Sequence, residues 1–156
     1  MKKVLLTLFC AVTAIYSASA APNATQPNLN KGETAMTKTS VKDYEAVKAV
    51  LNKYLDAGRE GKSDILRPYV HKDALMFGRA GGKLEGGSID NLFAYLDSHP
   101  AAKELEAEIT EIDIVEGIAH AKVESDNWNG ARFTDMFLLV KDGNDWKILT
   151  KTFYAH

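Results

Sequence analysis

The sequence predicts an α+β domain in which helices come first and a curled antiparallel sheet follows, packed over the first helix. Apolar residues recur at helical spacing between positions 43 and 57. Four later segments, at 107–115, 118–126, 132–140 and 146–154, alternate with the two-residue period of strands. Trp128-Asn129-Gly130 and Asp142-Gly143 are tight-turn signals that separate the last three of these strands.

Residues 1–20 have the pattern of a secretory signal peptide. Lys2 and Lys3 precede an apolar run, and Ala18-Ser19-Ala20 offers a small-residue cleavage site. A buried helix is the alternative, but the lysine start and the small-residue exit favour a signal. The run is too short to span a membrane. We therefore expect cleavage after Ala20, export to the periplasm or the medium, and no stable membrane insertion.

The remaining composition excludes several classes of function. The only cysteine, Cys10, lies within the signal, so the mature chain would have no thiol for a disulfide, a nucleophile or a zinc site. The chain has a net charge of −2, and losing Lys2 and Lys3 leaves 17 basic against 21 acidic residues, or about −4. A mildly acidic surface argues against nucleic acid as a partner.

Residues 21–38 are rich in Asn, Thr, Gln, Pro, Lys and Gly and contain little to bury. This composition predicts a disordered linker. Residues 39–156 remain, which is the usual size of one domain.

The first helix begins at a capping sequence, Ser40-Val41-Lys42-Asp43. We expect it to run from Asp43 to Ala57, because Gly58 and Gly61 interrupt the pattern, and to bury a face that includes Tyr54.

A short second helix is expected at 63–67, stopped by Pro68, and a brief strand at 74–77. The glycines between 78 and 87 then predict either a mobile loop or a two-stranded ribbon. Ser88 is expected to cap a third helix that ends near His99-Pro100.

The strand at 132–140 is apolar on both faces. Alternation places Phe133, Asp135, Phe137 and Leu139 on one face and Thr134, Met136, Leu138 and Val140 on the other. Helices can cover only one of these faces. The second face therefore predicts a twofold homodimer that pairs through the sheet. In the last strand, the same alternation places Trp146, Ile148 and Tyr154 together, as core or pocket wall.

Three stretches resemble one known superfamily: the helix at 43–57, Tyr69-Val70-His71-Lys72-Asp73-Ala74, and Trp146-Lys147-Ile148. The chain is similar over residues 41–153 to nuclear transport factor 2-like proteins, the cystatin-like α+β cones, and within them to the secreted bacterial lumazine-binding or SnoaL-like branch. The resemblance implies a curved antiparallel or mixed sheet wrapped around the N-terminal helices. Function stays open, because this fold carries isomerases, dehydratases, cyclases, hydrolases and non-catalytic binding modules.

Ketosteroid isomerase, which has the same fold, offers a comparison at the level of residues. It implies that Tyr54 and Asp135 are hydrogen-bond donors to an oxyanion or carbonyl. Its general-base aspartate would fall at or beside Gly78, where this sequence has no side chain. The resemblance thus implies the donors of an isomerase without its base.

Asp135 is the most informative candidate, because it stands between Phe133 and Phe137. Desolvation favours its neutral form unless a cation lies close. It is either an acid of a pocket or a structural aspartate bonded to backbone, Arg132 or Lys151. Tyr54 is likewise either a ligand-binding residue or a core tyrosine.

His71 is a candidate general base, because imidazole titrates near neutral pH. The alternative is that His71-Lys72-Asp73-Ala74 forms a turn whose polar groups cap local backbone. No metal-ligand spacing links His71, Asp73, His99, His120 and His156, and no phosphate-binding or dinucleotide motif is present. We therefore expect neither a metal nor a cofactor.

The sequence is compatible with two main functions. The first is an exported protein that binds a small aromatic or heterocyclic molecule between the first helix and the sheet, through Tyr54, Phe77, Phe133, Asp135, Phe137 and Trp146. The alternative is an isomerase, dehydratase or cyclase with His71 or Asp135 as base and Tyr54 as electrophile. A purely structural role as an association module is a third possibility.

Overall fold

Six strands form one mixed sheet in the order β2-β1-β6-β5-β4-β3 in the computed structural model, which describes residues 39–156. The strands are β1 (Val70–Ala80), β2 (Lys83–Ser88), β3 (Glu106–Val115), β4 (Ile118–Trp128), β5 (Ala131–Asp142) and β6 (Asp145–Ala155). Only β1 and β6 pair in parallel. The sheet does not close into a barrel, which confirms the expected α+β class. The expected signal and linker lie outside the described residues.

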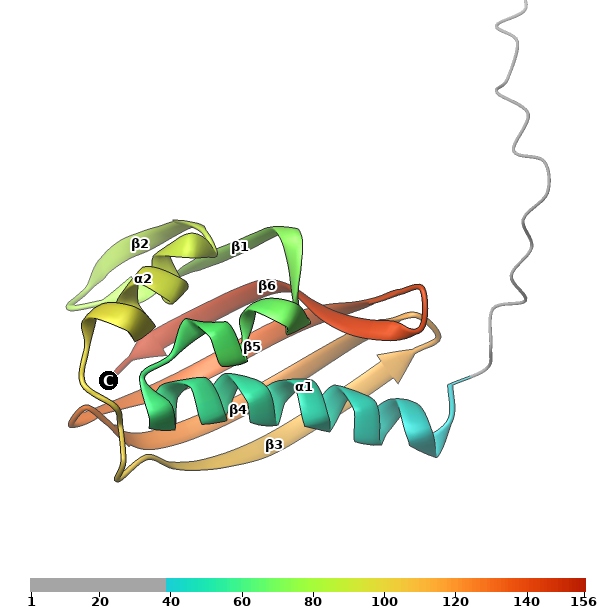
Figure 1. The fold of residues 1–156 in the computed structure, drawn as a ribbon, viewed down its shortest axis with the longest axis horizontal. Coiled ribbons are helices and arrows are strands. Elements are labelled where there is room, and N and C mark those ends of the chain that lie inside the picture. The colour runs from blue at the N-terminus through green and yellow to red at the C-terminus, as the bar shows by residue number, and fades with distance from the viewer. Residues whose placement is uncertain (1–38) are drawn as a thin grey trace, which may run out of the picture. The chain divides into compact units, whose positions relative to one another are not determined.

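Two helices, α1 (Val41–Glu60) and α2 (Asp90–Ser98), pack on one face of this sheet, as Figure 1 shows. The hydrophobic core lies between them and the inward side chains of the strands. Neither described helix is long and apolar enough to cross a membrane. The opposite face of the sheet has no helix over it within residues 39–156.

Helix α1 starts as the sequence predicts. Ser40 caps it, and the backbone N–H of Ser40 donates to Asp43 Oδ2 at 2.9 Å in a capping box. The expected end at Ala57 is wrong, because the helix continues to Glu60 and stops at Gly61, whose φ is +60°. Gly58 lies within the helix, and the Trp128 ring packs so close to it that a Cβ at this position would lie 2.5 Å from the ring, which leaves room only for glycine.

Residues 61–88 correct the sequence interpretation in several places. The expected helix at 63–67 is two 3₁₀ turns, Ser63–Ile65 and Arg67–Tyr69, and Pro68 lies inside the second turn. The expected short strand is the 11-residue β1, which includes the His71–Ala74 stretch. The glycine-rich region is the two-stranded ribbon of β1 and β2, which turns at Gly81-Gly82.

Strand β6 contains an irregularity that the sequence pattern did not predict. Leu138 of β5 pairs with Thr150, whereas Leu139 pairs with Ile148, so Leu149 is an extra residue, a β-bulge. The bulge reverses the alternation beyond it: Lys151 and Phe153 face the helices, and Tyr154 is 51% exposed on the other side. The expectation that Tyr154 shares a face with Trp146 and Ile148 is therefore wrong.

Candidate functional site

A cavity of about 400 Å³ lies between α1, α2 and the inward face of the sheet. This volume is in the usual range for small-molecule sites. Most of its wall is aromatic or aliphatic. The lining residues are Tyr54, Met76, Ala80, Glu85, Gly86, Asn91, Leu92, Tyr95, Trp128, Phe133, Lys151, Phe153 and Ala155.

One wall of this cavity carries a buried network of three side chains. The Tyr54 hydroxyl donates to Asp135 Oδ2 at 2.7 Å, and the Lys151 ammonium donates to Asp135 Oδ1 at 2.6 Å. Asp135 is 0% and Lys151 4% exposed. Tyr54 and Lys151 reach the cavity, whereas Asp135 lies behind them. Asp135 therefore joins the two residues without itself lining the wall.

Each member of the network comes from a different element. Tyr54 belongs to the buried stripe of α1, together with Val47 and Leu51. Asp135 is on the inward face of β5, as alternation predicts. Lys151 faces inward only because of the bulge at Leu149. The first two positions follow from local periodicity, and the third does not.

The network answers the question that the sequence left open about Asp135. A cation lies within hydrogen-bond distance of Asp135, which is the condition under which the neutral form was not expected. The geometry favours the alternative, a buried structural aspartate bonded to Lys151. Burial raises the pKa of the Tyr54 hydroxyl well above its ordinary value, and the charge and hydrogen bond of Asp135 raise it further.

Lys151 brings an ammonium group to the wall of the cavity. Its only hydrogen bond to a residue in the range 39–156 goes to Asp135, which leaves N–H groups for a ligand. Its Nζ atom also lies 4.6 Å from the centre of the Phe153 ring. The Tyr54 hydrogen is committed to Asp135, which itself only accepts. The resemblance to ketosteroid isomerase implied two donors, Tyr54 and Asp135. In the structure these two residues bond to each other, and Lys151 is the donor beside them.

The other residues predicted for the site are dispersed. Phe133 lines the cavity, but Phe137 lies in the core with its ring centre 5.0 Å from that of Tyr54. Trp146 is also in the core, where its indole N–H donates to Asp43 at 3.3 Å. Phe77 is 41% exposed, because β1 alternates and turns it to the face away from the helices.

His71 does not line the cavity either. Its Nδ1 atom accepts from the backbone N–H of Asp73 at 3.2 Å, so it caps local backbone as the alternative interpretation proposed. Within residues 39–156, no group of three or more His, Cys, Asp or Glu side chains is placed to hold a metal ion.

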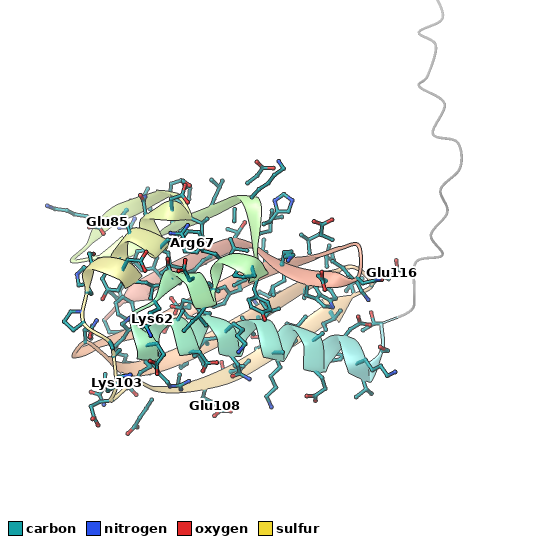
Figure 2. All side chains as sticks on the ribbon, viewed as in Figure 1. Lys62, Arg67, Glu85, Lys103, Glu108 and Glu116 are labelled. Atoms are coloured by element: carbon teal, nitrogen blue, oxygen red, sulfur yellow. The ribbon has the colours of Figure 1, made fainter. Side chains whose placement is uncertain are left out.

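Sequence reasoning missed most of the residues that line the cavity, among them Lys151, Glu85, Asn91, Tyr95 and Trp128. Tyr95 could have been found, because it lies on the expected third helix. Trp128 was assigned to a turn and is in fact the last residue of β4, buried against Gly58. Glu85 was not predicted, because the glycines on either side of it left open whether this segment is a loop or a strand. Figure 2 shows Glu85 on the edge strand β2, at the end of the molecule where α2 crosses the ribbon.

The fold and this cavity define a protein of the nuclear transport factor 2-like superfamily, with a helix-covered sheet and a pocket at one end. Residues 42–154 match the family described as "Putative lumazine-binding". The chain belongs to that family.

Three relatives illustrate the similarity. An NTF2-like protein from Methylobacillus flagellatus is 40% identical with a TM-score of 0.72, and the match covers 76% of this chain and 96% of that one. One from Shewanella baltica is 37% identical with a TM-score of 0.73, covering 77% and 98%. A protein from a Cladobotryum species, described as "Aldolase FrzH", is 31% identical over 115 residues, which are 73% of this chain and 92% of that protein.

Proposed function

We propose that the protein binds a small planar molecule, aromatic or heterocyclic, whose carbonyl or ring-nitrogen acceptor is held by Lys151. The single observation that carries this proposal is a buried ammonium with free N–H groups at the wall of a largely apolar cavity. A buried donor without an acceptor is costly, about 1–3 kcal/mol. A ligand that supplies the acceptor removes that cost.

The charge of the network narrows the ligand further. Lys151 and Asp135 together carry no net charge, so a neutral acceptor satisfies the ammonium without adding a second buried anion beside Asp135. The rings of Tyr95, Trp128 and Phe133 suit the faces of a flat ligand. A neutral aromatic ketone or a carbonyl-bearing heterocycle meets both requirements.

A fluorescence titration tests this proposal. The chain has two tryptophans, and only Trp128 lines the cavity. In a Trp146→Phe background, a neutral aromatic ketone should change the emission of Trp128 in a saturable way. Replacing Lys151 and Asp135 together by Met and Asn should weaken binding at least tenfold, whereas Lys48→Met, on the exposed side of α1, should not. Equal affinities in all three proteins contradict the proposal.

Catalysis is the second candidate, and one observation favours it. A relative that is 31% identical over most of the domain is described as an aldolase. Aldol chemistry passes through an enolate, whose oxyanion an ammonium stabilises. Lys151 is the residue that would hold this oxyanion here. In both the binding proposal and the catalytic one, Lys151 holds the oxygen of the ligand's carbonyl group.

Export and self-association complete the proposal. The signal pattern of residues 1–20 supports release into the periplasm or the medium after cleavage behind Ala20. The open face of the sheet carries exposed apolar side chains on three adjacent strands, including Phe77, Met136 and Leu138. A face of this kind supports a homodimer that pairs through the sheet.

A further inference from the structure

Glu85 is a carboxylate that the network around Lys151 does not use. It lines the cavity from β2, and it makes no hydrogen bond or ion pair with any other residue between 39 and 156. It pairs directly with Gly78 of β1, so both residues face the same side of the ribbon. Gly78 has no room for a side chain, because a Cβ there would lie 2.3 Å from Phe153. Glu85, an exposed residue of the edge strand, therefore brings a carboxylate to the cavity at the level of Gly78.

Two neutral side chains at the cavity, Asn91 and Tyr54, donate hydrogen bonds within the protein, whereas the Tyr95 hydroxyl bonds to no residue between 39 and 156. Asn91 donates its side-chain amide to the Gly86 carbonyl at 3.4 Å, and Tyr54 donates to Asp135. Both oxygens of Asp135 accept hydrogen bonds. The cavity thus has one cation with free donors, Lys151, and one free anion, Glu85.

The sheet sets the separation of these two charges. Lys151 on β6 is level with Met76, whereas Glu85 on β2 is level with Gly78, and β1 lies between the two strands. Across the sheet, their Cα atoms are two strand spacings of about 4.8 Å apart, and along the strands they are offset by two residues, or about 7 Å. The two components together give a Cα–Cα separation of roughly 12 Å. Both side chains extend toward the cavity. A carbonyl group held by Lys151 and the carbon next to it would therefore lie in the cavity between the two residues.

We propose that Glu85 is the general base that removes a proton from the carbon next to the carbonyl held by Lys151, and this assignment rests on the binding mode proposed above. The C–H bond breaks and its proton moves to the Glu85 carboxylate. The C–H electron pair forms a carbon–carbon double bond, and the carbonyl π pair moves to oxygen, where the Lys151 ammonium stabilises it. Return of the proton to carbon restores the ketone. The substrate class is a neutral aromatic ketone with an acidic C–H group.

Positioning of Lys151 is the role of the other two residues of the network. Asp135 fixes the position of the Lys151 ammonium through a 2.6 Å hydrogen bond, and Tyr54 holds the second oxygen of Asp135. Neither Asp135 nor His71 can act as the base. The first has both oxygens occupied, and the second lies outside the cavity.

The test is deuterium exchange into phenylacetone in heavy water, followed by proton NMR on the full mature chain. The wild-type protein should accelerate exchange at the benzylic carbon. Glu85→Gln should lower the rate at least about a hundredfold, because a general base contributes roughly 10²–10⁴-fold. Glu85→Asp should keep part of the rate. Glu108→Gln, an exposed glutamate on the opposite edge strand β3, should keep all of it (Figure 2).

Binding of the ketone is measured on the same samples by Trp128 fluorescence, and thermal melts verify that each variant is folded. Binding that persists in Glu85→Gln while exchange is lost supports the assignment. Exchange at the wild-type rate in Glu85→Gln overturns it, as does wild-type protein that binds the ketone without accelerating exchange. Absence of binding overturns the proposed ligand class, and the assignment with it.

Discussion

The ammonium of Lys151 lies 2.6 Å from a carboxylate oxygen of Asp135, and both side chains are shielded from solvent. This pair joins strands β5 and β6 beneath the cavity. A buried ion pair is not a large net source of stability, but losing one partner leaves an uncompensated charge. The pair therefore makes the pocket wall sensitive to single substitutions.

Asp135→Asn should destabilise the protein at neutral pH by about 3–5 kcal/mol, because Lys151 is then buried without its counter-charge. Urea unfolding at pH 7 measures the loss. The double variant Asp135→Asn with Lys151→Met removes both charges and should recover part of it. A single Asp135→Asn variant more stable than the wild type would show that the carboxyl group is neutral in the fold.

Tyr54 should ionise only at a pH well above the ordinary tyrosine pKa of about 10. Because its folded-state pKa is raised, its contribution to stability is complete below the unfolded value of about 10 and falls as pH rises beyond that value. Near-ultraviolet absorbance should therefore show one tyrosine that ionises only on unfolding. Tyr54→Phe should abolish this signal, reduce the alkaline loss of stability, and cost about 1.5–3 kcal/mol at pH 7 through the lost hydrogen bond to a charged group. Normal titration of every tyrosine would argue against the buried hydroxyl.

Gly58→Ala should destabilise the protein by about 1–3 kcal/mol, although alanine is the better helix former by about 1 kcal/mol. The added Cβ would meet the Trp128 ring at 2.5 Å and displace a wall of the cavity. Gly117→Ala is the matched control, since its nearest neighbour, Lys141 Cβ, would be 3.8 Å away. Thermal melts should therefore show a lower melting temperature for Gly58→Ala than for Gly117→Ala. A Gly58→Ala protein as stable as Gly117→Ala would contradict the packing of Trp128.

Met136→Lys should convert the proposed dimer into a monomer, because the charge falls in the middle of the open apolar face. Multi-angle light scattering at micromolar concentration measures the mass of both proteins. Val41→Lys, at an exposed position on α1, is the control and should leave the dimer intact. A wild-type monomer under these conditions would reject pairing through the sheet.

The mature protein should begin at Ala21, or at Pro22 if cleavage shifts by one residue. Intact-mass analysis of protein from the envelope fraction measures this. Ala20→Asp, which removes the small residue at the cleavage site, should leave the signal attached. Wild-type protein that retains Met1 would contradict export by this route.

The sequence alone determined much of the fold, because its signals are local. The capping box at Ser40, the helical stripe that contains Tyr54 and the alternation that turns Asp135 inward all depend on residues only a few positions apart. The boundaries of the last four strands were correct to within two residues for the same reason. The Asp142-Gly143 turn signal also placed the β5–β6 hairpin correctly.

Tertiary structure alone decided which residues meet at the site. Gly58 has the sequence pattern of a helix end, and only the Trp128 ring packed against it shows why a glycine stands inside the helix. Glu85 reaches the cavity because it pairs with Gly78, a partner that the sequence does not specify. Lys151 reaches it because one extra residue, Leu149, is accommodated where β6 meets β5. A bulge shifts every later side chain to the opposite face, and its position is set by how neighbouring strands pair and not by the composition of its own strand.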